Sequence, residues 1–365
     1  MSATHYIGIM SGTSLDGVDA VLVDFTQSCP LEHTCYMPYD AALRAALLAL
    51  NQRSEDELHR AAVLANRIAR LYAESVRRLL DETGINPRQI VAIGCHGQTV
   101  RHYPQPENGY SIQLVNGALL AELTGIAVVT DFRSRDIAAG GQGAPLVPAF
   151  HQEVFAHSAI DRSIVNIGGI ANITCLPVNG HVTGFDCGPG NILLDAWCAR
   201  HLDTPYDRDG QWGVSGRVIP RLLENLQAFP YFSLPPPKST GREMFNIDWL
   251  QSYLQGDEAA QDVQATLVAL TATTITRAVS AYFPEADEIY LCGGGAHNGA
   301  LVDQLRQGLP ASDIKLTNAL GIDADWVEAC AFAWLAQRAI ERAPGNLPDV
   351  TGANESRILG AIYPA

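Results

Sequence analysis

The chain has 365 residues, 47% of them hydrophobic, and a formal net charge of -15. This length and composition are sufficient for the buried cores of about two domains. The negative charge excludes a basic surface that would collect nucleic acid, and it would be repelled by an anionic membrane. The N-terminus lacks a basic segment followed by a long apolar run, and no apolar run is long enough to span a bilayer, so we expect a soluble cytoplasmic protein.

The eight cysteines include no Cys-x-x-Cys pair. Their even number is compatible with disulfides. In a long chain without an export signal, however, we expect free thiols.

The first predicted elements are two strands, residues 6–10 and 18–25, which flank a turn rich in Gly, Ser, Thr and Asp. Such a turn offers backbone N–H groups to a phosphate, because its glycines allow close approach. The carboxylates of Asp16 and Asp19 could then hold Mg2+ or orient a reacting hydroxyl or water. The alternative is an ordinary hairpin whose Asp and Gly residues serve only the turn.

Helices are predicted at residues 43–50 and 54–82, the second with a capping box at Ser54 and Glu57 and an end at Gly84. A strand at 90–95 then leads into a loop that carries His96 and Gln98. Open α/β sheets bind ligands at this end of their strands. A strand at 111–114, a helix at 116–124 and a strand at 126–131 complete the first α/β unit, and the Gly-rich residues 139–145 follow as its boundary.

The second half begins like the first, with strands at 163–167 and 170–176 joined by Gly168-Gly169. A third strand at 181–185 leads to Asp186 and to a helix that starts at Ile192. Two halves that each open with a Gly-turn hairpin predict a duplicated architecture. Further elements are expected in this order: a helix at 215–227, a long surface loop at 232–245, a helix at 262–282, a strand at 288–292, and helices at 296–308 and 325–342.

Three Gly turns follow predicted strands: Gly12 to Gly17, Gly168-Gly169 and Gly293-Gly294-Gly295. There is no P-loop motif, and the Gly-rich turns fail the dinucleotide-binding pattern at its last glycine. In this order the three turns resemble the phosphate 1, phosphate 2 and adenosine motifs of the actin, Hsp70 and sugar-kinase superfamily. The resemblance implies a two-lobed α/β ATPase fold with an interlobe active-site cleft.

A narrower resemblance covers residue 6 to the C-terminus, with no departure at a motif position. The chain is similar to the anhydro-N-acetylmuramic acid kinase family in motifs that begin at Gly8, Gly94, Asp131, Asn166, Gly184 and Cys292 and read GIMSGTSLDG, GCHGQT, DFRSRD, NIGGIAN, GFDCGPGN and CGGGAHN. The segments PKSTGRE from Pro236 and DVTG from Asp349 also fit.

This resemblance implies an ATP-dependent kinase that opens 1,6-anhydro-N-acetylmuramic acid with water and phosphorylates O6. The products would be N-acetylmuramic acid 6-phosphate and ADP, in bacterial cell-wall recycling, with Mg2+ as the metal. Another sugar kinase acting on a free hydroxyl and a partner-gating ATPase are the alternatives. The first lobe would be residues 1–131, joined by part of 345–365, and the second 132–344. The sequence leaves the oligomeric state open, with a homodimer as one alternative.

The resemblance also implies roles for single residues. Asp186 would be the catalytic base, although its position alone favours a helix N-cap. His96 and Gln98 would contact the sugar, and Arg133 and Arg135 its lactyl carboxylate, unless the arginines pair with Asp131 or Asp136. Asp16 and Glu328 would hold the metal, unless Glu328 is a surface residue. The nucleotide would be bound by Gly12, Thr13, Ser14, Leu15, Asp16, Gly17, Val18, Asp19, Gly168, Gly169, Gly293, Gly294, Gly295 and Asn298, the last of which could also be only a helix cap.

Overall fold

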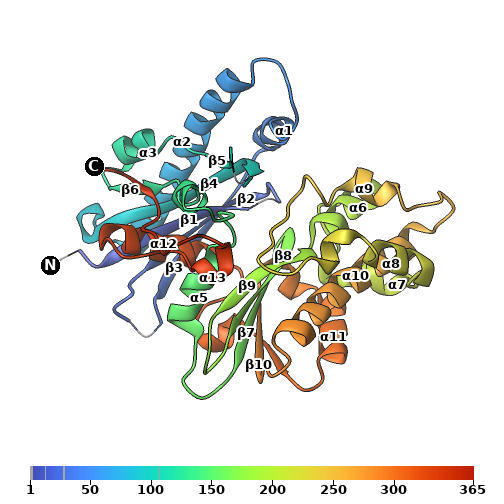
Figure 1. Cartoon of the computed structure of the whole chain (residues 1–365). Helices are drawn as coiled ribbons and strands as arrows, with labels where there is room; N and C mark the ends of the chain where they lie inside the picture. Colours follow the sequence, from blue (N-terminus) through green and yellow to red (C-terminus); the bar gives the residue numbers. More distant parts are fainter. Residues whose placement is uncertain (1–2, 13, 28, 106) are drawn as a thin grey trace. The chain divides into compact units, whose positions relative to one another are not determined.

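A computed structural model describes residues 3–12, 14–27, 29–105 and 107–365 (Figure 1). The chain forms two compact units: unit 1 contains residues 1–150 and 326–365, and unit 2 contains residues 151–325. These limits differ from the expected ones at 131 and 344. The second limit moves to 325 because the helix of residues 327–340 packs on the sheet of unit 1. Glu328 therefore belongs to unit 1 and not to the second lobe.

Unit 1 is built on a seven-stranded sheet in the order β12-β6-β4-β1-β2-β3, with β5 paired to the far half of β4. Its strands are β1 (His5–Ser11), β2 (Gly17–Val23), β3 (Leu31–Pro38), β4 (Ile90–Tyr103), β5 (Tyr110–Leu114), β6 (Val128–Thr130) and β12 (Ala361–Tyr363).

Unit 2 is built on a five-stranded sheet in the order β11-β10-β7-β8-β9. Its strands are β7 (Arg162–Ile167), β8 (Ile170–Leu176), β9 (Thr183–Pro189), β10 (Glu288–Cys292) and β11 (Asp313–Leu316). In both units the first strand pairs antiparallel with the second and parallel with the fourth, and a further parallel strand follows. The α/β fold and its duplicated plan are thus confirmed.

Helices cover the sheet faces of each unit (Figure 1). Those of unit 1 are α1 (Ala41–Ala49), α2 (Glu57–Thr83), α3 (Gly117–Thr124), α4 (Ser134–Ala138), α12 (Val327–Ile340) and α13 (Pro348–Thr351). Those of unit 2 are α6 (Ile192–Leu202), α7 (Gln211–Ser215), α8 (Pro220–Gln227), α9 (Ile247–Gln251), α10 (Ala260–Tyr282) and α11 (Gly299–Gly308), while α5 (Val147–Phe155) crosses the boundary between the units.

The core of unit 1 follows from the alternation of side chains along β1. Ile7 and Ile9 are fully buried in a cluster that includes Ile68 and Tyr72 of α2. Gly8 faces the other way, toward the backbone of α12. A Cβ on Gly8 would lie 1.9 Å from the carbonyl oxygen of Ala329, so this position requires glycine.

Gly94 of β4 plays the same part beside Gly8. The two glycines are partners in the parallel register, and a Cβ on Gly94 would lie 1.9 Å from the carbonyl oxygen of Phe332. Together they let the small-residue face of α12 approach the sheet closely. This contact ties the end of the chain to its first strand.

Several local predictions are confirmed and others are wrong. Gly84 ends α2 in the left-handed conformation, as expected. The capping box at Ser54 does not form, because the helix begins at Glu57 with Asp56 as its N-cap; Glu57 pairs with Arg101 at 2.7 Å. The strand predicted at 90–95 continues to Tyr103, so His96 and Gln98 lie in β4 and not in a loop.

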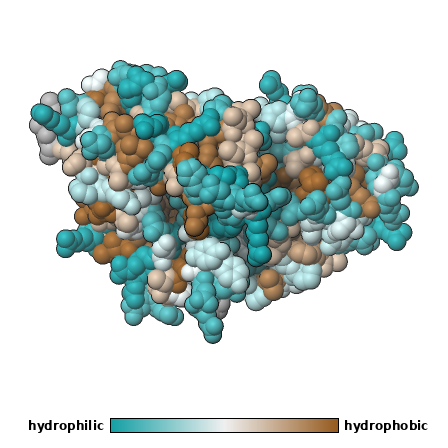
Figure 2. Space-filling view, turned by 90° about the horizontal axis from the view of Figure 1, so that it is seen from above, coloured by the Kyte–Doolittle hydropathy of each residue, from teal (hydrophilic) through white to brown (hydrophobic). Residues whose placement is uncertain are grey.

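The remaining global expectations concern thiols and surface. The eight cysteines are thiols and not disulfides, as predicted. None of the described helices has the length and apolarity needed to cross a membrane. The face in Figure 2 is mostly hydrophilic, with apolar side chains in small groups, which agrees with the high net charge.

Candidate active site

Gln98 of β4 holds the turn between β1 and β2 by a hydrogen bond. Its Nε2 donates to the carbonyl oxygen of Gly12 at 3.0 Å, and Leu15 closes the turn with an N–H bond of 3.4 Å to the same oxygen. Asp16 is exposed and accepts from the N–H of Gly17 at 3.0 Å. Val18 and Asp19 lie in β2, and Thr13 lies outside the described residues. Hydrogen bonds to the Gly12 carbonyl oxygen and to the Asp16 carboxylate thus hold the described residues of the turn in place.

The base of this turn is a buried hydroxyl network that the sequence did not reveal. Tyr39 donates from its hydroxyl to Ser11 Oγ at 2.9 Å, and Ser11 Oγ lies 2.6 Å from the hydroxyl of Tyr72. Tyr39 also reaches Gln98 Oε1 at 3.3 Å. Burial raises the pKa of Tyr39 to about 12, so its hydroxyl remains a donor. Gln98 therefore has partners on both sides, and its predicted contact with the sugar stays a prediction.

His96 and Arg133 form a pair in unit 1. The guanidinium of Arg133 donates to His96 Nε2 from Nε at 3.2 Å and from Nη2 at 2.9 Å, and to the carbonyl oxygen of Gly143 from Nη1 at 2.6 Å. The His96 ring is buried and lies 4.6 Å from the ring of Phe332. The structure thus brings together His96 and Arg133, two of the predicted sugar contacts, and His96 orients the guanidinium of Arg133.

Arg135 and Asp136 are neighbours on the short helix α4 but differ in exposure. Arg135 is exposed, whereas Asp136 is fully buried. The Asp136 carboxylate accepts from the Gly143 N–H at 2.7 Å, from Asn346 Nδ2 at 2.6 Å and from Thr351 Oγ1 at 2.7 Å. Asp136 therefore connects the Gly-rich segment to the C-terminal part of the chain. Thr351, the threonine of the DVTG motif, is one of its partners, which gives that motif a structural role.

In unit 2 the second and third Gly turns lie together. The carbonyl oxygens of Gly168 and Gly169 accept from Asn191 N at 2.8 Å and Gly190 N at 2.9 Å. A Cβ on Gly295 would lie 2.3 Å from the side chain of Ile167, the last residue of β7. The turns after β7 and β10 and the start of α6 are thus packed on one another.

Two of these glycines face open space. A Cβ on Gly168 or Gly294 would meet no atom closer than 3.5 or 3.8 Å, whereas Gly293 is tightly enclosed by Asn166 and has a φ of 76°. Open backbone at paired Gly turns fits the approach of a phosphate. Asn298 instead accepts from Leu301 N at 3.1 Å as the N-cap of α11, so its role as a helix cap is confirmed.

Asp186 lies inside β9, opposite Asn172 of β8, and is 7% exposed. It does not cap α6, because the N-cap of that helix is Asn191. The carboxylate oxygen Oδ2 accepts from the Thr240 N–H at 2.9 Å. A carboxylate with a fixed orientation in a largely dry site is suited to accept a proton.

Comparisons with known proteins identify the family. The sequence profile of the family described as "Anhydro-N-acetylmuramic acid kinase" matches residues 4–365. The chain belongs to the anhydro-N-acetylmuramic acid kinase family.

Two relatives with this name cover nearly the whole chain. The protein of Nitrosomonas europaea is 71% identical over 99% of this chain and 100% of its own length, and that of Nitrosospira multiformis is 59% identical over 100% of both. Among solved structures, component A of (R)-2-hydroxyglutaryl-CoA dehydratase from Acidaminococcus fermentans is 12% identical over 90% of this chain and 96% of its own, with a TM-score of 0.49. The family assignment does not depend on that distant likeness.

Membership of this kinase family raises the question of the metal. Asp16 and Glu328 both belong to unit 1, with Glu328 in the first turn of α12. Mg2+ in kinases is held by one or two carboxylates, waters and the substrate phosphates, so an all-protein cluster is not required. The exposed carboxylate of Asp16 at the tip of a phosphate-type turn fits such a role.

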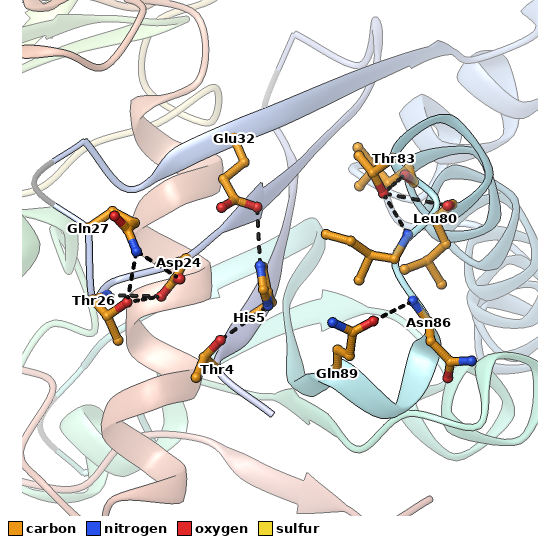
Figure 3. Close-up of polar contacts among 12 residues, drawn as sticks. Thr4, His5, Asp24, Thr26, Gln27, Glu32, Leu80, Thr83, Asn86 and Gln89 are labelled. Atoms are coloured by element: carbon orange, nitrogen blue, oxygen red, sulfur yellow. Dashed lines mark hydrogen bonds and ion pairs between the residues drawn. The ribbon is translucent and has the colours of Figure 1, made fainter. Parts of the chain in front are cut away.

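The part of the chain that the structure describes contains one group of three possible metal ligands, His5, Asp24 and Glu32, whose ligand atoms lie within 4.8 Å of one another (Figure 3). These side chains have other partners. His5 Nε2 lies 3.2 Å from Glu32 Oε2, and Asp24 accepts from the N–H and hydroxyl of Thr26 at 3.0 and 2.7 Å. Asp24 thus serves a local turn, and His5 and Glu32 form a separate pair. The group lies at the start of β1, whereas the Gly turn follows its end.

Proposed function

We propose that this kinase uses ATP and water to open 1,6-anhydro-N-acetylmuramic acid and yields N-acetylmuramic acid 6-phosphate and ADP. The observation that carries the proposal is the family match over residues 4–365, joined by relatives whose names state this activity. We place the reaction in the cytoplasm, where ATP is available for the recycling of cell-wall sugars.

The proposed reaction couples a glycoside hydrolysis to a phosphoryl transfer. Water attacks C1 and gives its proton to a base, the bond from C1 to the bridging oxygen breaks, and this oxygen, now O6, attacks the γ-phosphate. The bond between that phosphorus and ADP breaks. One base is sufficient, because the leaving oxygen of the first step is the nucleophile of the second.

Asp186 is the base in this proposal. Its burial, its place within a strand and the hydrogen bond from Thr240 N–H to Oδ2 support the role, because they hold one carboxylate oxygen in place. The nearby Gly188 has a φ of 151°, outside the range of ordinary side chains, so the backbone after the base is specialised as well.

The Gly turns would hold the nucleotide. We assign the phosphates to the turn of residues 12–19 and to Gly168 and Gly169, and the adenosine to the turn of residues 293–295 and Asn298. Bound Mg2+ would neutralise charge that develops on the phosphates, and Asp16 and Glu328 would hold it.

The sugar would be oriented by unit 1. Arg133 presents a planar guanidinium that is suited to a carboxylate, with His96 fixing its plane. Arg135, exposed on α4, is the second candidate for the lactyl carboxylate, and Gln98 a candidate for a hydroxyl or the acetamido group.

A phosphorylation assay with the anhydro sugar and a panel of open-ring sugars tests this function. We expect turnover with 1,6-anhydro-N-acetylmuramic acid and little with N-acetylmuramic acid or N-acetylglucosamine. Preference for an open-ring sugar would identify a kinase of another specificity, and ATP hydrolysis without sugar would indicate a gating ATPase.

Two further measurements test the mechanism. In labelled water the new C1 hydroxyl should carry the heavy oxygen, whereas label in the phosphate would mean plain ATP hydrolysis. Asp186→Asn should abolish turnover while leaving ATP binding largely intact. Full activity in that variant would remove Asp186 as the base.

A further inference from the structure

Residues 230–245 form a segment of unit 2 that makes three hydrogen bonds with Asp186. The Asp186 N–H donates to the carbonyl oxygen of Lys238 at 3.2 Å, and the Tyr231 hydroxyl donates to the Asp186 carbonyl oxygen at 2.7 Å. The Thr240 N–H reaches Oδ2 at 2.9 Å. One segment thus fixes both the backbone of Asp186 and an oxygen of its side chain.

Aromatic packing anchors the two ends of this segment. Tyr231 is 3% exposed and Phe245 is fully buried, with their ring centroids 5.6 Å apart. Phe232 stacks on Phe245 at 5.6 Å. The expectation of a long surface loop at 232–245 is therefore wrong at the two ends of the segment, where aromatic side chains are buried.

Lys238 lies at the centre of the segment with its side chain turned inward. It is 7% exposed, its Nζ donates to the Tyr231 carbonyl oxygen at 3.3 Å, and it lies 4.8 Å from the centre of the Tyr231 ring and 5.7 Å from that of Phe185. Of the 24 Lys and Arg residues in the chain, only Lys238 and Lys315 are lysines. A buried ammonium is costly and is retained where its charge has a use.

Asp186 supplies that use. Burial lowers the pKa of Lys238, and the negative charge of Asp186 opposes this shift. The other ionisable groups near Asp186 are Tyr231, Cys187 and, beside Tyr231, Glu243. Burial raises the pKa values of Tyr231 and Cys187, so both stay neutral at physiological pH. Lys238 is thus a buried positive charge among groups that are otherwise neutral or acidic.

We propose that Lys238 is a positioning residue for Asp186: its charge keeps the carboxylate ionised, and the segment that it anchors aims Oδ2 at the attacking water. The inference rests on the proposed function, in which Asp186 accepts a proton from that water. A nearby opposite charge favours the ionised carboxylate, and only this form can act as the base.

Lys238→Met tests the effect on catalysis, with Lys315→Met as the matched control because Lys315 is part-exposed on β11. We expect kcat to fall about tenfold for Lys238→Met, with KM for ATP unchanged. The acidic limb of the kcat/KM profile should move to higher pH by about one unit, because the carboxylate protonates more easily without the cation. The control should keep the wild-type profile.

Tyr231→Phe separates charge from anchoring. This variant loses the hydroxyl that holds the Asp186 carbonyl oxygen but keeps the ring beneath Lys238. We expect a lower kcat with the acidic limb in place. If Lys238→Met lowers the melting temperature and leaves the acidic limb unmoved, Lys238 is only structural and the inference is overturned.

A second measurement needs no turnover. With labelled lysine, NMR of a chain with two lysines shows two side-chain sets, and Lys315→Met identifies the one from Lys238. Asp186→Asn should lower the titration midpoint of Lys238 and leave that of Lys315 in place, because charge coupling is reciprocal. An unchanged Lys238 midpoint would refute the coupling whether or not the anhydro sugar is the substrate. Failure of the sugar assay alone would refute the function but not the coupling.

Discussion

Arg133 donates two hydrogen bonds to a single atom of His96, its Nε2. Because arginine can only donate, this nitrogen carries no proton and the neutral ring has its proton on Nδ1. Burial, and next the charge of Arg133, lower the pKa of His96 well below 6.5, so the ring remains an acceptor at physiological pH. His96 therefore fixes the plane of the guanidinium.

We expect His96→Phe and Arg133→Lys each to raise KM for the anhydro sugar about tenfold, with KM for ATP unchanged. The first removes the acceptor while keeping a ring beside Phe332, and the second removes the planar fork. Because both act through one interaction, the double variant should lose little more than either single variant. Additive losses in steady-state kinetics would show that the two residues act separately.

Gly8→Ala and Gly94→Ala should destabilise the fold. The new methyl group would overlap a carbonyl oxygen of α12 in each case, and such overpacking costs about 1–3 kcal/mol or more. Urea unfolding measures the loss. Wild-type stability in both variants would mean that α12 does not sit as closely on β1 and β4 as the structure shows.

Gly168→Ala and Gly294→Ala should behave in the opposite way. Their methyl groups have room in the protein, so we expect little change in unfolding free energy. The same groups would occupy the space proposed for the nucleotide, and affinity for ATP, measured by calorimetry, should fall about tenfold. Unaltered affinity in both variants would argue against a phosphate site at these turns.

Stability should decrease as the pH falls below 6.5. Burial lowers the pKa of His151 from 6.5 to about 3, so the unfolded chain takes up a proton over this range that the folded chain does not. At pH 5 the loss from this one residue is about 2 kcal/mol relative to neutral pH. His96 has the same sign and adds to the slope.

His151→Gln isolates this contribution. The difference in unfolding free energy between pH 7.5 and pH 5 should shrink by about 2 kcal/mol in the variant. An equal slope in His151→Gln and the wild type would show that His151 is protonated in the folded chain.

The features that the sequence predicted are those with local causes. The Gly turns, Gly84 at the end of α2 and the strand before Gly293 each follow from neighbouring residues. Features that depend on distant partners were missed. β4 extends past His96 because its far half pairs with β5, and Glu57, expected in a capping box with Ser54, instead pairs with the distant Arg101.

The candidate site divides in the same way. Asp186 and the glycines could be named from motifs, since each lies in a short, distinctive segment. The supports around them could not, because Tyr39, Tyr72 and Tyr231 reach their partners across 28 to 61 positions. Lys238 could be noticed in the sequence in two ways, because it lies in the PKSTGRE segment and is one of only two lysines.

The insertion of α12 between the sheet of unit 1 and solvent determines the order in which the chain can mature. The ribosome synthesises residues 151–325, all of unit 2, before it synthesises α12, the helix that packs on Gly8 and Gly94. Asn346 and Thr351, the partners of Asp136, are likewise synthesised after unit 2. β1 and β4 therefore emerge long before the helix that covers them, and an uncovered apolar sheet face is prone to aggregate during that interval.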